Sequence, residues 1–132
     1  MPTIGLQRAL TSTFDKAAEA LPAALEQEGF GVLTHIDVSG VLAKKLGVDF
    51  RRYAIFGACN PHFAHRALQL ELSIGVLLPC NVVLYENDDG TATVIAVDPM
   101  QTFAAGADDP TNTFDEIAGE VKARLQRVVD SL

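Results

Sequence analysis

Two apolar segments joined by a short polar turn constrain the fold of this chain more than any other feature. The segments span residues 80–86 and 91–97, and the turn between them reads Asn-Asp-Asp-Gly at 87–90. Asn, Asp and Gly tolerate the backbone conformations that tight hairpin turns require. Because a connection this short can join only antiparallel strands, the pattern predicts at least one antiparallel pair.

Amphipathic helices are predicted on both sides of this hairpin in the chain. A C-terminal helix from residue 113 presents one apolar stripe, formed by Phe114, Ile117, Val121, Leu125, Val128 and Leu132. An N-terminal helix after residue 13 presents another, formed by Phe14, Ala18, Leu21 and Leu25, with Gly29 as its C-cap. Pro22 lies inside this helix and predicts a kink or a break near Ala18–Leu21, because proline lacks the N–H that helices need.

The remaining segments complete an α+β pattern over residues 1–132, which we interpret as a single domain. Strands are predicted at 4–9, 30–36 and 53–59, and a short helix at 41–46, capped by Asp37 and closed by Gly47. Asn60-Pro61 predicts a helix from Pro61 to about Leu72, since Asn is a favoured N-cap and Pro a favoured first helical residue. Residues 98–112 are predicted to form a long loop. Long helices must then cover one face of a sheet that contains an antiparallel hairpin.

Charge and composition exclude several classes of partner. The chain has 10 Lys and Arg against 17 Asp and Glu, a net charge of −7, which argues against a nucleic-acid partner. The basic cluster Lys44, Lys45, Arg51 and Arg52 is interpreted as a helix C-terminus and the solvated loop after it. No apolar stretch is long enough to span a bilayer, and the N-terminus has no signal-peptide pattern, so no membrane association and a cytoplasmic location are expected. Glycine-rich phosphate-binding motifs are absent, and no cofactor is expected.

Both cysteines of the chain precede an asparagine, in Cys59-Asn60 and Cys80-Asn81. If residues 73–79 return the chain across the end of the sheet, Cys59 and Cys80 lie close together. If the helix after Pro61 is instead a parallel crossover, they lie at opposite ends. We favour proximity, because glycine and proline turns frame both pairs.

Three functional interpretations of these pairs compete with a purely structural one. The first is a small-molecule pocket in which Asn60 and Asn81 supply hydrogen bonds and Phe56, Phe63, Leu77 and Tyr85 form the wall. The second is thiol chemistry at a cysteine activated by a helix N-terminus, with His62 or His65 as the base. The third is a soft-metal site of Cys59, His62, His65 and Cys80, which no paired metal-binding motif supports, so no metal is predicted. The structural interpretation makes the thiols small core residues and Asn60 a helix cap.

Three long motifs carry a resemblance to a known family. They are GFGVLTHIDV at 29–38, KKLGVDFRRYAIFGACNP at 44–61 and IGVLLPCNVVLYE at 74–86. With these motifs the chain resembles the family named for a domain of unknown function, DUF302. The resemblance implies a curved, mainly antiparallel sheet with helices on one face, similar to the TATA-binding-protein architecture, and a homodimer, but it implies no activity. A ligand-binding or sensing module with a pocket at Cys59, Asn60, Cys80, Asn81, Phe56 and Tyr85 is our leading hypothesis, with a thiol-dependent redox enzyme or an interaction protein as alternatives.

Overall fold

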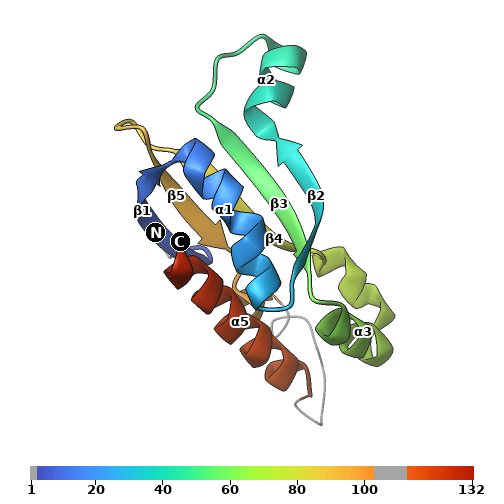
Figure 1. Ribbon diagram of the computed structural model, residues 1–132. Coiled ribbons are helices and arrows are strands. Elements are labelled where there is room, and N and C mark those ends of the chain that lie inside the picture. Colours follow the sequence, from blue (N-terminus) through green and yellow to red (C-terminus); the bar gives the residue numbers. More distant parts are fainter. Residues whose placement is uncertain (1–2, 103–112) are drawn as a thin grey trace.

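The computed structural model of the protein describes residues 3–102 and 113–132. Five strands form one antiparallel sheet in the order β1-β5-β4-β3-β2. The strands are β1 (Leu6–Thr13), β2 (Gly31–Asp37), β3 (Tyr53–Cys59), β4 (Cys80–Glu86) and β5 (Thr91–Ala96). The long helices α1 (Phe14–Gln27) and α5 (Thr113–Ser131) cover one face of this sheet (Figure 1), which confirms the predicted α+β class.

The hairpin that constrains the fold forms as predicted between β4 and β5. The N–H of Asn87 donates to the carbonyl of Thr91 over 2.7 Å, and Gly90 adopts a positive φ of 87°. Glycine reaches this left-handed conformation without steric cost, whereas most side chains do not. The turn therefore sets the register of two central strands, on which the rest of the sheet is built.

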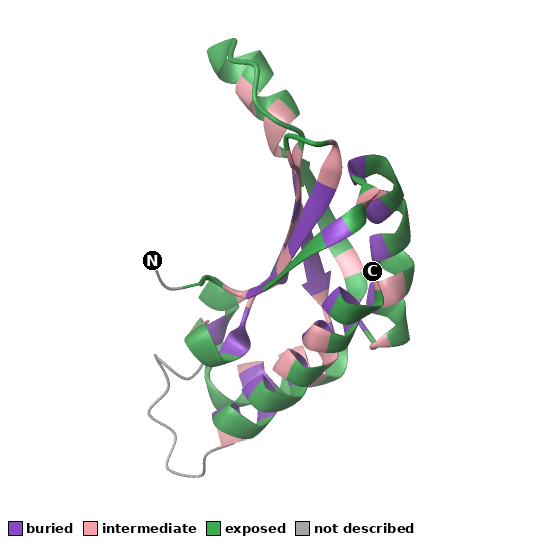
Figure 2. Cartoon of the chain, turned by 90° about the vertical axis from the view of Figure 1, so that its left-hand side faces the viewer, coloured by how far each residue is buried: buried purple, intermediate pink, exposed green. Residues whose placement is uncertain are grey.

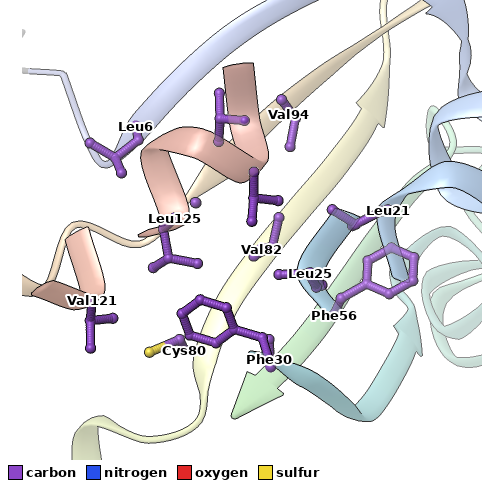
Figure 3. Close-up of a cluster of buried hydrophobic side chains, with 14 of the residues drawn as sticks. Leu6, Leu21, Leu25, Phe30, Phe56, Cys80, Val82, Val94, Val121 and Leu125 are labelled. Atoms are coloured by element: carbon purple, nitrogen blue, oxygen red, sulfur yellow. The ribbon is translucent and has the colours of Figure 1, made fainter. Parts of the chain in front are cut away.

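The hydrophobic core lies between the sheet and the two long helices. Helix α5 contributes the largest share, since seven of its side chains are buried, among them Leu125, which has no exposed surface. Helix α1 adds Leu21 and Leu25, which are also fully buried. Figure 3 shows these side chains meeting Val82 and Val94 of the central strands. Burial of apolar side chains at helical spacing is what fixes both helices on the sheet.

Of the kink or break predicted near Ala18–Leu21, the break does not occur. Helix α1 continues through Pro22 as one element, and the proline lies on its exposed side. The carbonyl of Ala18 loses its usual helical partner there, because proline has no N–H. Leu21 and Leu25 flank the proline on the buried side, and their packing holds the helix together across it.

The other connections differ from the predictions at a few element ends. Helix α2 (Val38–Leu46) starts at the predicted cap, since the Asp37 carboxylate accepts from the N–H of Gly40 over 3.0 Å. Helix α3 (Pro61–Leu70) ends earlier than predicted, and a 3₁₀ turn, η1 (Leu72–Leu77), leads into β4. A short helix, α4 (Pro99–Thr102), stands where the long loop was predicted to begin, and the rest of that loop lies outside the described residues.

In the part of the chain that the structure describes, no long helix packs over the face of the sheet opposite α1 and α5. Successive strand residues alternate between faces, so residues next to buried Ala54, Leu84 and Val94 lie on this second face. We call it the open face. Strand pairing aligns four of its side chains into one row across four strands, which we call the aliphatic row: Ile36, Ile55, Val83 and Ile95. Among the described residues, no helix is long and apolar enough to cross a membrane.

Truncation of Leu125 should measure the contribution of the core. Leu125→Ala is expected to lower the free energy of unfolding by about 2–5 kcal/mol, because it leaves a cavity under α5. Leu72→Ala is the matched control, since Leu72 is 85% exposed, and it should change the same quantity by less than about 0.5 kcal/mol. Urea unfolding followed by circular dichroism compares the two. Equal effects would contradict this assignment of the core.

Candidate functional site

The two Cys-Asn pairs lie at the same end of the sheet. Strands β3 and β4 are antiparallel neighbours, and Ala58 pairs directly with Cys80. Cys59 ends β3 where Cys80 begins β4, and the chain between them returns through α3 and η1. The expectation that the two cysteines lie close together is therefore confirmed, and the parallel crossover is excluded.

Both cysteines line one small cavity, which we call the thiol cavity. Its volume is about 20 Å³. Cys80 is 7% exposed and lies beside Phe30 in the core (Figure 3), while Cys59 is half-buried. Most of the other lining is apolar and comes from α3, α5 and the strand ends: Phe30, Ala58, Phe63, Ala64, Ala67, Leu78 and Val121, together with Asn60.

Asn60 occupies the N-cap position of α3, but its side chain does not cap the helix. Its amide nitrogen donates instead to the carbonyl of Glu28, at the end of α1, over 3.4 Å. The guanidinium of Arg124 on α5 donates to the same carbonyl over 3.1 Å. The prediction that the Asn60 side chain caps α3 is therefore wrong. The side chain instead links the start of α3 to the end of α1 by a hydrogen bond. Its Oδ1 atom is buried and has no hydrogen-bond partner within the described structure.

Burial keeps both thiols neutral. It raises the pKa of Cys59, and it raises the pKa of Cys80 to about 11, with a further contribution from the neighbouring Cys59. Loss of hydration raises the pKa of Cys59, which is the opposite direction to the activation expected from the α3 N-terminus. A thiol with a raised pKa is a poor nucleophile near neutral pH, since the thiolate is the reactive form.

The contents of the thiol cavity are limited by its size. A volume of about 20 Å³ holds roughly one water molecule. Asn60 lines the cavity, and its buried side-chain oxygen Oδ1 has no hydrogen-bond partner in the described structure, so one water molecule there is the donor that this acceptor lacks. The histidines of the metal interpretation, His62 and His65, are both exposed, and the described residues contain no group of three or more metal-binding side chains.

The remaining predicted site residues lie elsewhere. Asn81 is exposed on the open face, because it follows Cys80 on a strand and so points to the opposite side. Tyr85 lies on the open face too, stacked on Tyr53 with ring centroids 5.7 Å apart. Phe56 is buried on the helix side, where the His35 ring stacks on it at 4.5 Å. The six predicted residues therefore divide between the two faces of the sheet and do not form one pocket.

A larger depression, which we call the sheet groove, lies on the open face over β1, β5 and β4. Its volume is about 470 Å³, within the range of roughly 300–1,000 Å³ that small-molecule sites occupy. Val83 and Ile95 of the aliphatic row form part of its floor, and Asn81 supplies an amide. The full lining is Ile4, Gly5, Gln7, Tyr53, Asn81, Val83, Ile95, Ala96, Val97, Asp98, Gln101 and Thr102.

Two polar residues of the groove, Gln101 and Asp98, were not identified from the sequence. Gln101 of α4 accepts from the N–H of Gly5 over 3.0 Å and donates to the carbonyl of Thr3. The buried carboxylate of Asp98 pairs with Lys122 at 3.1 Å. No local pattern links residues 98 and 101 to β1, so only strand pairing brings them together. By contrast, the sequence already predicts a strand at 80–86, and neighbouring residues of a strand point to opposite faces of the sheet. This pattern alone indicates that Asn81 and Cys80 lie on different faces.

The fold is that of a protein family without an assigned activity. The family model described as "Domain of unknown function DUF302" matches residues 6–132, so the chain belongs to this family. The chain is similar to the crystal structure of an uncharacterized conserved DUF302 protein from Bacillus stearothermophilus. The two are 33% identical over 94% of each chain, with a TM-score of 0.84. A comparison with curated proteins found no match.

The raised thiol pKa values predict slow alkylation. Iodoacetamide at pH 7.5 should modify both cysteines of the folded protein much more slowly than those of the urea-unfolded chain, and Cys80 more slowly than Cys59. Mass spectrometry of the quenched protein counts the adducts, and Cys59→Ser isolates Cys80. Rapid modification of Cys59 in the folded state below pH 7 would contradict the assignment of a neutral thiol.

The same burial predicts a loss of stability at high pH. The pKa of Cys80 is about 11 in the folded chain, against an ordinary value of 9.0. The neutral thiol is therefore fully favourable to folding below pH 9, and its contribution disappears as the pH rises towards 11. Between pH 9 and 11 the urea midpoint of the wild type should fall with pH. The midpoint of Cys80→Ala should fall less steeply, because the variant has no thiol at this position. Parallel curves would contradict the prediction.

Proposed function

We propose that this protein is a small-molecule binding module whose ligand lies in the sheet groove. The observation that supports the proposal most is a hollow of about 470 Å³ on the face opposite α1 and α5, whose lining combines aliphatic side chains with the amide of Asn81. The thiol cavity, at about 20 Å³, is too small for such a role. The proposal therefore keeps the class of function expected from the sequence and moves its site to the open face, where Asn81 lies.

The lining of the groove favours a neutral ligand. Asp98 is 7% exposed and already paired with Lys122, so it offers no free charge. The Asn81 side chain makes no hydrogen bond to another described residue, and its amide can both donate and accept. The amides of Gln7 and Gln101 are already engaged with the backbone of the N-terminal segment.

The apolar part of the lining defines the body of the ligand. Val83 and Ile95 form a flat aliphatic surface, and Tyr53 stands at its edge with its ring held by the stack on Tyr85. Flat rings pack well on such surfaces, and a ring held by stacking loses little conformational freedom on binding. We therefore infer a planar, uncharged molecule that carries one amide-like or hydroxyl group for Asn81.

Thiol chemistry is not proposed. The raised pKa values of Cys59 and Cys80 remove the activation that the mechanism needs, and the candidate bases His62 and His65 are exposed on α3. A structural role in the packing around the thiol cavity accounts for the burial of Cys80.

Ligand-observed NMR with neutral aromatic fragments tests the proposal. Benzamide and nicotinamide are expected to bind wild-type protein in the millimolar range, and Asn81→Ala should weaken binding at least fivefold, because the hydrogen bond to the amide is lost. Asn87→Ala is the matched control, since that asparagine belongs to the hairpin turn outside the groove, and its variant should bind as wild type does.

Two results would overturn the proposal. The first is equal binding by wild type and Asn81→Ala. The second is a screen of several hundred neutral fragments, extended by native mass spectrometry of freshly purified protein, in which nothing binds.

A further inference from the structure

Both thiols of the chain line the same small space. Strand β3 ends where β4 begins, and Ala58 pairs with Cys80, so Cys59 lies one residue along from that pair. Both cysteines line the thiol cavity, and both are free of any disulfide. Cys80 lies beside Phe30, among the side chains of the core (Figure 3), on the side of the sheet that α1 and α5 cover (Figure 2). The fold therefore brings the two thiol ligands of the chain together in a shielded place.

The surroundings of the thiols favour a soft metal ion over a hard one. Apart from the thiols and Asn60, the side chains that line the cavity are apolar, whereas Mg²⁺ and Ca²⁺ require a set of oxygen ligands. Structural Zn²⁺ sites take four protein ligands, and the described residues hold no cluster of three or more such side chains. Thiolates are ligands that monovalent copper prefers. Cu(I) also accepts two thiolates in a linear arrangement, so it needs no further ligand.

Asn60 supports the presence of an occupant in the cavity. The residue is 7% exposed, and its buried Oδ1 atom has no hydrogen-bond partner among the residues that the structure describes. The amide nitrogen donates to the carbonyl of Glu28, so Oδ1 cannot turn away without loss of that hydrogen bond. A buried acceptor without a partner is unfavourable unless something outside the protein chain satisfies it. A cation near the two sulfur atoms can satisfy the lone pairs of Oδ1, as a water proton can.

Positive groups lie next to the cavity, although its own lining is neutral. Val121 of α5 lines the cavity, and Arg124 lies about one helical turn further along, 5.2 Å from the ring centre of Phe63. The Nε atom of Arg124 is buried without a hydrogen-bond partner in the described structure, and the nearest carboxylate paired with it, on Glu120, is 4.0 Å away. Cys59 lies just before the N-terminus of α3, the positive end of the helix dipole. These groups can stabilise a negative charge at the thiols.

We propose that Cys59 and Cys80 bind one Cu(I) ion in the thiol cavity as a pair of thiolates. The ion displaces the S–H proton of each cysteine, so two Cu–S bonds form, two protons pass to the solvent and no electron is transferred. The resulting centre has a net charge of −1, which Arg124 and the α3 N-terminus stabilise. The cavity volume of about 20 Å³, roughly the space of one water molecule, limits the site to a single ion.

Anaerobic titration of the reduced protein with Cu(I), in competition with the chelator bicinchoninate, tests the proposal. Wild type should bind one ion per chain and release two protons for each ion bound. Cys59→Ser and Cys80→Ser should each weaken binding by about 100-fold or more, because each removes one of the two soft ligands. His62→Ala with His65→Ala is the matched control, since both histidines are exposed on α3, and this variant should bind as wild type does.

Arg124 is expected to act on the centre through its charge. Arg124→Met should weaken Cu(I) binding about tenfold, and Arg124→Lys should restore most of the loss, because it keeps the positive charge. Arg66→Met is the matched control, since it removes an exposed guanidinium from α3, and it should leave the affinity unchanged. X-ray absorption at the copper edge of the loaded wild type should show two sulfur ligands and no histidine nitrogen.

Several results would sink the proposal. They are a wild type that binds no Cu(I) against the chelator, a folded serine variant that binds as tightly as wild type, and a copper spectrum dominated by nitrogen ligands. Circular dichroism establishes that each variant is folded, and Cys59→Ser decides the outcome if Cys80→Ser unfolds, because Cys59 is only half-buried. Asn81→Ala should bind Cu(I) normally, since Asn81 lies on the open face, so this proposal and that of the sheet groove can fail separately.

Discussion

Packing of two amphipathic helices on the same face of the sheet is the constraint on which the rest of this structure depends. Helix α5 buries seven side chains and α1 buries four, and together they cover the central strands. A five-stranded sheet has two faces, and these long helices supply a cover for only one of them. The aliphatic row and the sheet groove both follow from that asymmetry.

The elements that could be predicted from the sequence are those whose determinants are local. Strand β3 has the predicted bounds, Tyr53–Cys59, and the hairpin turn and the start of α3 at Pro61 are also as predicted. Turn chemistry, capping and helical periodicity act over a few residues, so they can be recognised without the fold. Pro22 was misjudged because its effect depends on Leu21 and Leu25, whose packing on the sheet is not a local property.

The candidate site was harder to predict because it depends on strand pairing. Cys59 and Cys80 share a cavity because β3 and β4 are antiparallel neighbours in this register. The sequence of the segment between the two strands did not reveal this pairing. That Cys80 and Asn81 lie on opposite faces could be predicted from strand alternation alone. The hydrogen bond between Gln101 and Gly5 could not, because it joins residues almost the whole chain apart. The lack of buried side chains in α2 has no local sign either, since its residues form an ordinary short helix.

Alternation along β4 also bears on how sequences of this kind can diverge. Cys80, Val82 and Leu84 contact the core while Asn81, Val83 and Tyr85 lie on the open face. Insertion of a single residue between Cys80 and Asn81, unless a β-bulge absorbed it, would exchange the faces of the residues on one side of it. Chain length between Cys80 and Glu86 is therefore expected to tolerate less change than residue identity on the open face. Changes in length can accumulate in the connections between elements, while the open face remains free to acquire new chemistry by substitution.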